Sequence, residues 1–264
     1  MFALPTGVLL AGSFLAYDGA RVTASITADN YTALLGDGYF RLVLWRTLWM
    51  SGAVGAVCVM LGLLVAHYLV RSHSRFRGLV LLIVISPLVS SVVVRTYGWL
   101  VLLEREGLVN STLEQLGAID QPMKLIGSQF AIVIGLAHVL LPFAVFTVMS
   151  SLQGVDPSLE RASRDLGAGP VTTFRKVTLP LISPGLISGF ILTFAISLGA
   201  YATPRILGGG QLQTLATLVQ ERMISSLEWG QAAGIAVIIL AIGGTVVAFL
   251  LLIGRRAQAQ GAAQ

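Results

Sequence analysis

The sequence predicts an all-α, polytopic membrane protein with about six transmembrane helices. Mean hydropathy is +0.84, hydrophobic residues make up 55% of the chain and charged residues only 11%. A soluble domain carries about 25% charged residues. Apolar segments of membrane length also recur from end to end, and a spanning helix needs about 20 such residues. We therefore expect a single membrane domain over 1–264, with its core at 42–254.

Stretches without charged residues mark the expected spans. Five of them are long enough to cross a membrane, and only one contains a charge, Arg95. The five are 47–70, 79–103, 130–152, 181–204 and 229–254.

The segment 1–17 is apolar but short. A signal peptide would have a positively charged start and a small-x-small cleavage site. This start has no lysine or arginine, and Ala16-Tyr17-Asp18 fits such a site poorly. We expect a first spanning helix here, and a truncated beginning of that helix stays open as an alternative.

Prolines and paired glycines interrupt the apolar segments. Pro87, Pro142 and Pro184 lie where neighbouring helices can satisfy the backbone groups that proline leaves free. Gly185-x-x-x-Gly189 and Gly230-x-x-x-Gly234 let helices approach closely. We favour packing within the chain over a dimer interface for both glycine pairs.

Orientation follows from the basic residues in short loops, which are enriched on the cytoplasmic side. One set of loops has nine basic and three acidic residues, and the other has seven basic and nine acidic. The basic residues of the first set are Arg71, Arg75, Arg77, Arg161, Arg164, Arg175, Lys176, Arg255 and Arg256. We expect a multi-pass membrane protein with both termini in the cytoplasm. The high pI reflects this orientation, and nucleic acid is not an expected partner.

The sequence lacks the motifs of an enzyme. No phosphate-binding loop is present, because the run Gly208-Gly209-Gly210 is followed by Gln211 with no lysine. His67, His73 and His138 form no metal-ligand pair, and the single Cys58 excludes an intramolecular disulfide. We expect no catalytic residue, metal or cofactor in this chain, so any energy for work comes from another chain.

A charged island lies between two apolar segments, at 156–168. Asp156 can cap a helix whose first residue is Pro157, and the negative Glu160 suits the first turn. The helix is expected to run to Leu166, with Gly167 as its left-handed terminator.

The island helix has a narrow apolar face. Leu159, Ala162 and Leu166 share it, at spacings of three and four. A helix lying in the lipid interface would have a larger face with bulky anchors, so we favour insertion into a groove on a soluble partner. A second short helix is expected after Gly169-Pro170, and Leu179-Pro180 then turns the chain back into the membrane.

The island resembles the EAA loop (here 156–180) of the permease subunits of binding-protein-dependent ABC importers, which have a MetI-like fold. The matching positions are Ala162, Asp165-Leu166-Gly167-Ala168, Phe174, Val177, Leu179-Pro180 and Pro184-Gly185. In that family the loop forms a coupling helix that docks on the ATPase. The resemblance departs at Arg161, which stands at the usual glutamate position, with Glu160 one residue early.

This resemblance implies the partners and the site. The partners are a cytoplasmic ATPase dimer that binds ATP and magnesium, a second homologous permease, a periplasmic binding protein and the lipid bilayer. The resemblance also implies a place in the bacterial inner membrane, and a cycle in which ATP binding closes the ATPase and switches the bundle from inward- to outward-facing. The implied coupling residues are Leu159, Glu160, Arg161, Ala162, Asp165, Leu166, Gly167 and Ala168.

Other segments resemble the spermidine/putrescine branch of this family. They are 29–35, Arg95-x-Tyr97-Gly98, 117–122, 140–143 and 198–209. The resemblance implies a polyamine importer. Phosphonate, another amine or amino-acid derivative, sulfate or iron stays open as the cargo, because permeases for these solutes share much of the pattern.

Candidate residues of a translocation path are Arg95, Tyr97, Trp99 and Tyr201. A charge at membrane depth faces a polar cavity or a partner, so Arg95 is either a path residue or a structural arginine that snorkels outward or pairs with a helix-end carbonyl or with Glu104. Aromatic faces could attract a cation, although they could equally form an interfacial belt.

The two rival functions are an ion-driven secondary transporter and a membrane anchor. An ion-driven secondary transporter would need acidic residues inside the membrane, and no expected span contains Asp or Glu. A non-transporting membrane anchor of a signalling complex would have no ATPase partner.

Overall fold

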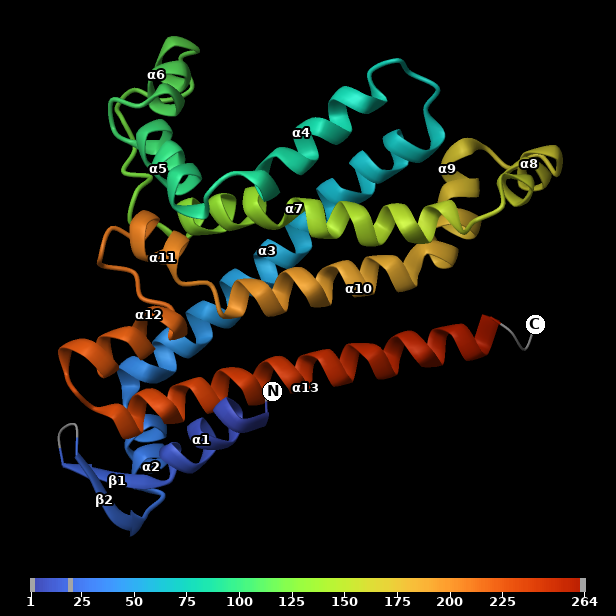
Figure 1. Cartoon of the computed structure of the whole chain (residues 1–264). Coiled ribbons are helices and arrows are strands. Elements are labelled where there is room, and N and C mark those ends of the chain that lie inside the picture. The colour runs from blue at the N-terminus through green and yellow to red at the C-terminus, as the bar shows by residue number, and fades with distance from the viewer. Residues whose placement is uncertain (1–2, 19–20, 262–264) are drawn as a thin grey trace. The chain divides into compact units, whose positions relative to one another are not determined.

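The computed structural model describes residues 3–18 and 21–261 and is mainly helical (Figure 1). Its elements are α1 (Ala3–Ser13), β1 (Leu15–Asp18), β2 (Arg21–Ile26), α2 (Asp29–Gly36), α3 (Gly38–Arg71), α4 (Arg77–Val89), α5 (Val92–Leu103), α6 (Leu108–Gln115), α7 (Gln129–Gln153), α8 (Pro157–Asp165), α9 (Pro170–Thr173), the π-helical turn η1 (Phe174–Thr178), α10 (Leu179–Leu198), α11 (Ala202–Leu207), α12 (Leu215–Gln220), the π-helical turn η2 (Glu221–Ser225) and α13 (Trp229–Gly261). The predicted helical membrane architecture is confirmed.

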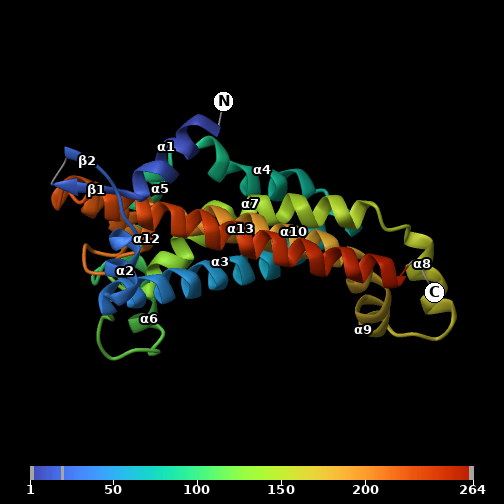
Figure 2. The ribbon, with the colours of Figure 1, turned by 90° about the horizontal axis from the view of Figure 1, so that it is seen from below.

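The chain forms two compact units. Unit 1 contains 1–51, 96–135 and 198–245, and unit 2 contains 52–95, 136–197 and 246–264. The helices α3, α7 and α13 contribute residues to both units, and α13 runs as one continuous helix (Figure 2). The expected single domain with a core at 42–254 stays a prediction.

The described residues contain four helices that are long and apolar enough to cross a membrane. They are Gly38–Arg71, Gln129–Gln153, Pro170–Leu198 and Trp229–Leu250. A fifth candidate is a broken pair, Arg77–Val89 with Val92–Gln115, bent by 108°. The expected number of six spans is therefore not confirmed.

The expected first span, 1–17, differs most from the structure. Helix α1 has 11 residues, which rise about 16 Å against a hydrocarbon core of about 30 Å. The chain then forms an antiparallel hairpin in which Tyr17 pairs with Val22. Asp18-Gly19 is a typical hairpin sequence, and that signal did not enter the prediction. Residues 1 and 2 lie outside the described part.

The expected span 79–103 is broken after α4. Ser90 adopts an extended conformation, with φ −95° and ψ 154°, and α5 then starts in a new direction. The span expected at 181–204 is also shifted, since its helix begins at Pro170 and ends at Leu198. Tyr201 is the N-cap of a separate short helix, α11, which begins at Ala202.

Two prolines inside helices have their lost hydrogen bond replaced locally. Proline removes the amide that would bond the carbonyl four residues earlier. The Ser86 hydroxyl donates to Ile83 O at 2.9 Å beside Pro87, and the Ser183 hydroxyl donates to Pro180 O at 2.7 Å beside Pro184. The preceding serine takes the role that we expected from neighbouring helices.

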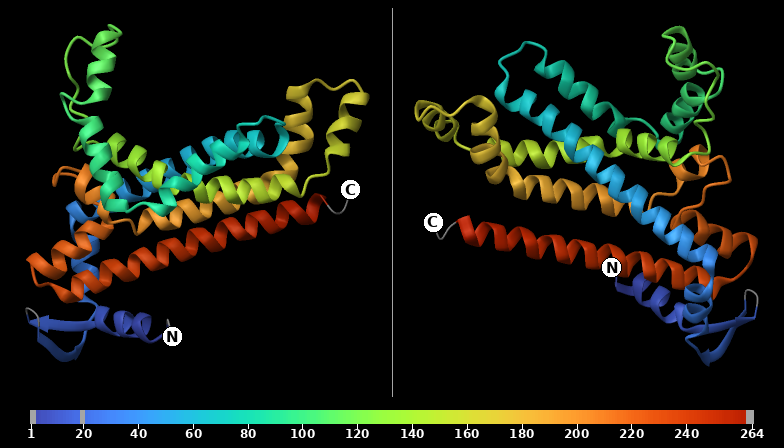
Figure 3. Two further views of the ribbon diagram at one scale, coloured as in Figure 1. Left: turned by 45° about the horizontal axis from the view of Figure 1, so that its top comes forward. Right: turned by 180° about the vertical axis from the view of Figure 1, so that it is seen from behind.

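The paired glycines pack within the units. A Cβ on Gly185 would lie 2.4 Å from Ser151 Cβ and 2.9 Å from Thr147 O, so the backbone of α10 lies directly against α7 of unit 2. They run side by side in Figures 1 and 3. In unit 1, a Cβ on Gly230 would lie 2.7 Å from Asn30 Oδ1, which brings α13 against α2. Both contacts agree with packing inside the chain.

Candidate functional site

The charged island forms helix α8 with the predicted caps. Asp156 Oδ1 accepts a hydrogen bond from the Ser158 amide at 2.8 Å, and Pro157 is the first helical residue. This backbone hydrogen bond, helped by the Ser158 hydroxyl and by the Arg161 charge, lowers the pKa of the Asp156 carboxyl. Gly167 ends the helix with φ +85°, a conformation that favours glycine.

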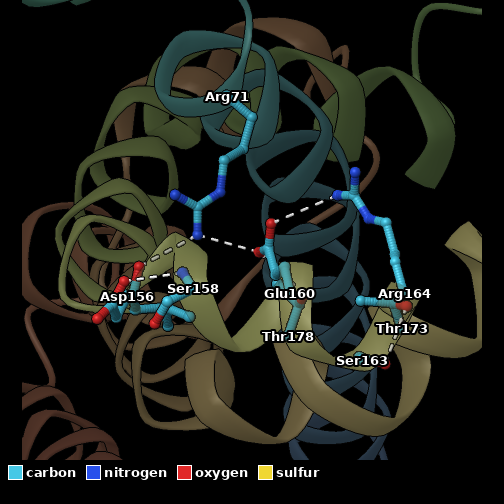
Figure 4. Close-up of polar contacts among 9 residues, drawn as sticks. Arg71, Asp156, Ser158, Glu160, Ser163, Arg164, Thr173 and Thr178 are labelled. Atoms are coloured by element: carbon cyan, nitrogen blue, oxygen red, sulfur yellow. Dashed lines mark hydrogen bonds and ion pairs between the residues drawn. The ribbon is translucent and has the colours of Figure 1, made fainter. Parts of the chain in front are cut away.

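One face of α8 is polar and turned into unit 2 (Figure 4). Glu160 is 7% exposed, and its Oε1 accepts hydrogen bonds from Arg71 Nη2 at 3.0 Å and from the Thr178 hydroxyl at 3.1 Å. Arg71 Nη2 also donates to Val155 O at 3.2 Å. We call Arg71, Glu160 and Thr178 the buried polar node. It joins α8 to the last residue of α3 and to the π-helical turn before α10.

Two further contacts hold the same face of α8. The hydroxyl oxygens of Ser163 and Thr173 are 3.1 Å apart, which links α8 to α9. Arg164 Nη2 lies 3.9 Å from Glu160 Oε2, with most of its side chain exposed. Exposed ion pairs contribute little stability, so Arg71 and Thr178 are the main partners of Glu160.

The opposite face of α8 is apolar and uncovered. Leu159 is 47% exposed and Leu166 is 89% exposed, and Ala162 between them is exposed as well. Soluble helices normally bury the apolar side and expose the charged side, so α8 is reversed. The other expected coupling residues are exposed or half-buried, and they are Arg161, Asp165, Gly167 and Ala168. Among the expected set, only Glu160 is buried.

The return of the chain differs from the prediction. Figure 3 shows α8 and α9 as a hairpin at the ends of α7 and α10. The α9 helix passes through the π-helical turn into α10, so Leu179-Pro180 makes no corner. The Leu179 amide donates to Phe174 O, five residues back, and Pro180 follows at a position where it cannot donate. The wider π-helical turn η1 therefore accommodates Pro180 without a break in the helix.

Two members of the node are not predicted as site residues by the sequence. Arg71 is expected only as one of the basic loop residues, and Thr178 has no expected role. Arg71 is 89 positions from Glu160 along the chain, and Thr178 is 18 positions away. A basic residue at the end of an apolar span was the only local signal.

The residues expected along a translocation path are divided between the units, with Arg95 in unit 2 and Tyr97, Trp99 and Tyr201 in unit 1. Arg95 donates from Nη1 to Pro87 O and from Nε to Ser91 O at 3.4 Å. This geometry matches the helix-end carbonyl alternative. In unit 1, the hydroxyls of Thr96 and Thr203 lie 3.2 Å apart.

The Thr96–Thr203 contact places α5 beside α11, next to Tyr201. Tyr97 is 54% exposed and Tyr201 38% exposed, and Trp99 is half-buried. These aromatic rings therefore come from neighbouring elements of one unit.

Unit 1 also contains a cavity of about 570 Å³. Its lining includes Glu104, Glu106, Lys124 and Gly209. The Gly127 amide donates to Leu207 O at 2.8 Å and holds two of the lining segments together. Over residues 3–18 and 21–261, no three histidine, cysteine or acidic side chains are grouped so that they could hold a metal ion.

Comparison with known proteins identifies the family. Residues 58–258 match the family model of the binding-protein-dependent transport system inner membrane component. The spermidine/putrescine transport system permease protein PotB of Haemophilus influenzae is 32% identical over 94% of this chain and 85% of its own length. PotB of Escherichia coli K12 is 31% identical over 92% of this chain and 89% of its own length.

A solved structure has the same fold. The crystal structure of a bacterial alginate ABC transporter in complex with an alginate pentasaccharide-bound periplasmic protein superposes with a TM-score of 0.77. That match has 17% identity and covers 97% of this chain and 89% of the other. The chain belongs to the binding-protein-dependent transport system inner membrane components, and it is a permease subunit of an ABC importer and not an enzyme.

Proposed function

We propose that this permease imports polyamines of the spermidine and putrescine class and is driven by a separate cytoplasmic ATPase. The two PotB relatives carry that cargo in their names and match more than nine-tenths of the chain. A second, similar permease subunit completes the path, and a periplasmic binding protein delivers the cargo. The ATPase binds the ATP and magnesium.

The observation that carries the coupling proposal is the reversed helix α8. An uncovered apolar face on a short helix is the usual anchor for a hydrophobic groove on another protein. Leu159, Ala162 and Leu166 supply that face, and the polar side that would normally meet water is used inside unit 2. With Glu160 buried, the polar contacts to the ATPase fall to Arg161 and Asp165.

The basic loops support an orientation with α8 and both termini in the cytoplasm. This orientation places the unit 1 cavity on the periplasmic side, where Lys124 and Gly209 can meet the binding protein. We propose the segments 120–124 and 202–210 as the contact with that protein, and both contribute residues to the lining of this cavity.

In this proposal the positively charged cargo is bound mainly by the faces of aromatic rings. No acidic residue lies inside the expected spans, so an organic ammonium ion depends on rings such as Tyr97 and Tyr201 and on backbone carbonyls. Arg95, whose guanidinium is bound to Pro87 O and Ser91 O, serves the break between α4 and α5 in this proposal.

Docking is tested by Leu166→Asp in a complex reconstituted with its ATPase, second permease and binding protein. Charge on the most exposed anchor should reduce ATPase co-purification and substrate-stimulated hydrolysis at least about tenfold, as for an interface anchor. Leu116→Asp is a matched control, because Leu116 is 74% exposed and also ends a helix before a left-handed glycine, Gly117. Normal hydrolysis and uptake by Leu166→Asp would show that α8 does not dock.

The cargo is tested by uptake of labelled spermidine into the same liposomes. Putrescine should compete, whereas phosphonate, sulfate, iron and amino acids should not. Competition by one of these other solutes, with no competition by putrescine, would reassign the cargo and leave the coupling proposal standing.

A further inference from the structure

We infer that Glu160 is a positioning residue that transmits movement of α8 to two membrane-spanning helices through the buried polar node. The inference rests on the proposed docking of α8. It assigns a role to Arg71, Glu160 and Thr178, none of which belongs to the exposed docking face.

The backbone segments on either side of α8 are too flexible to transmit its movement to the rest of unit 2. Gly154 precedes the helix, and Gly167 and Gly169 follow it. Glycine has the greatest backbone freedom of any residue. A nine-residue helix is also too short to hold its place through its own hydrogen bonds. Side-chain contacts must therefore carry force from α8 to the rest of unit 2.

The node supplies the stiffest of these contacts. Glu160 Oε1 receives two short hydrogen bonds from two different elements, at 3.0 Å and 3.1 Å. Hydrogen bonds to an ionised carboxylate are the stronger class, and burial of Glu160 keeps water from replacing them. Arg71 also donates to Val155 O, so it binds the chain on both sides of Asp156, the N-cap of α8.

The two donors belong to long helices. Arg71 is the last residue of the 34-residue α3. Thr178 is 2% exposed and ends the turn that runs directly into α10, within one continuous span of 29 residues. A pull on Glu160 therefore acts on the ends of α3 and α10 together.

A hollow beside the node leaves α8 room to move. It measures about 440 Å³, and its lining includes Leu64 and His67 of α3, Glu160 and Arg164 of α8, and Phe174. A partner could not displace a helix that is packed tightly on all sides, because close-packed interiors have low compressibility.

The test separates coupling from stability. Arg71→Met and Glu160→Gln should each keep the ATPase bound, since the docking face is intact, but lower uptake per ATP hydrolysed by about fivefold or more. Both should also lower the unfolding midpoint, because Arg71→Met strands the buried Glu160 carboxylate and Glu160→Gln removes the negative charge that pairs with the half-buried Arg71. The double variant Arg71→Met/Glu160→Met removes both charges and should recover the unfolding midpoint while uptake per ATP stays low.

A matched control is an ion pair in unit 1. Arg222 pairs with Glu228 and with Asp37, and Glu228→Gln should leave uptake per ATP unchanged. Recovery of both stability and uptake per ATP in the double variant would overturn the inference, since it would reduce the node to a structural pair. In that case loss of ATPase binding in Leu166→Asp still supports docking, whereas normal function of Leu166→Asp contradicts docking itself.

Discussion

Arg71 and Arg95 lie near helix ends in the same unit but bind different kinds of group. Arg71 donates to a carboxylate 89 positions away and to a carbonyl 84 positions away. Arg95 donates only to carbonyls four and eight positions away in the described contacts. The first arginine joins α3 to α8 and to the loop before α8, and the second caps a break within one expected span.

The two arginine charges are therefore stabilised by different kinds of group. A buried ion is costly unless paired, and Glu160 neutralises Arg71 while orienting it. Arg95 has carbonyl dipoles at the end of α4, where the helix dipole favours a positive charge. We therefore expect loss of Arg71 to disturb the loop between α7 and α10, and loss of Arg95 to disturb only the angle between α4 and α5.

The largest effect is expected for Arg71→Met. It strands the buried Glu160 carboxylate, and breaking such a pair costs about 3–5 kcal/mol. Chemical unfolding in detergent, followed by tryptophan fluorescence, measures the loss. Arg77→Met is a control, because Arg77 is an exposed basic residue at the start of α4. Equal losses in both variants would remove the special role of the node.

A smaller effect is expected for Arg95→Met. It removes charge-assisted hydrogen bonds to Pro87 O and Ser91 O, which are worth about 1.5–3 kcal/mol. Arg95→Gln keeps a side-chain donor and should recover part of the stability and the uptake rate. A path residue behaves differently: both variants would then change the KM for spermidine or the order of competing solutes, with the unfolding midpoint unchanged.

The comparison also shows what sequence reasoning could reach. Helix α8 was predicted to within a residue because its caps, Asp156-Pro157 and Gly167, are local signals. The unusual charge of Arg95 was visible, and its helix-end alternative is the one that the geometry matches. The node was missed because the spacing of Glu160 and Arg71 along the chain gives no measure of their distance in space.

The break after Val89 escaped prediction for a related reason. Ser90 and Ser91 carry no charge, so the apolar run 79–103 read as continuous. Backbone angles decide such a break, and two serines can also fit within a helix when their hydroxyls bond earlier carbonyls. The hairpin at 15–26 was not predicted because the apolar segment 1–17 overlaps its first strand.

Thr178→Val should have an intermediate to small effect. Valine has nearly the shape of threonine but leaves Glu160 Oε1 with Arg71 alone, at an expected cost of about 1 kcal/mol. The same change at Thr245, whose hydroxyl bonds the Ala241 carbonyl on the exposed side of α13, should cost less. A loss of uptake per ATP only in Thr178→Val would extend the role of the node to α10.

The smallest effect is expected from pH at the α8 cap. The pKa of Asp156 is lowered by the Ser158 amide, so its contribution is fully present above the unfolded value near 3.8. It is lost as the pH falls through the lower folded pKa. Asp156→Asn caps without a charge, so the difference in unfolding midpoint between wild type and Asp156→Asn should stay constant from about pH 7 to about pH 5 and shrink as the pH falls below about 4. A difference that grows on acidification would mean that the carboxylate is not stabilised by the cap, and the node alone would then fix α8.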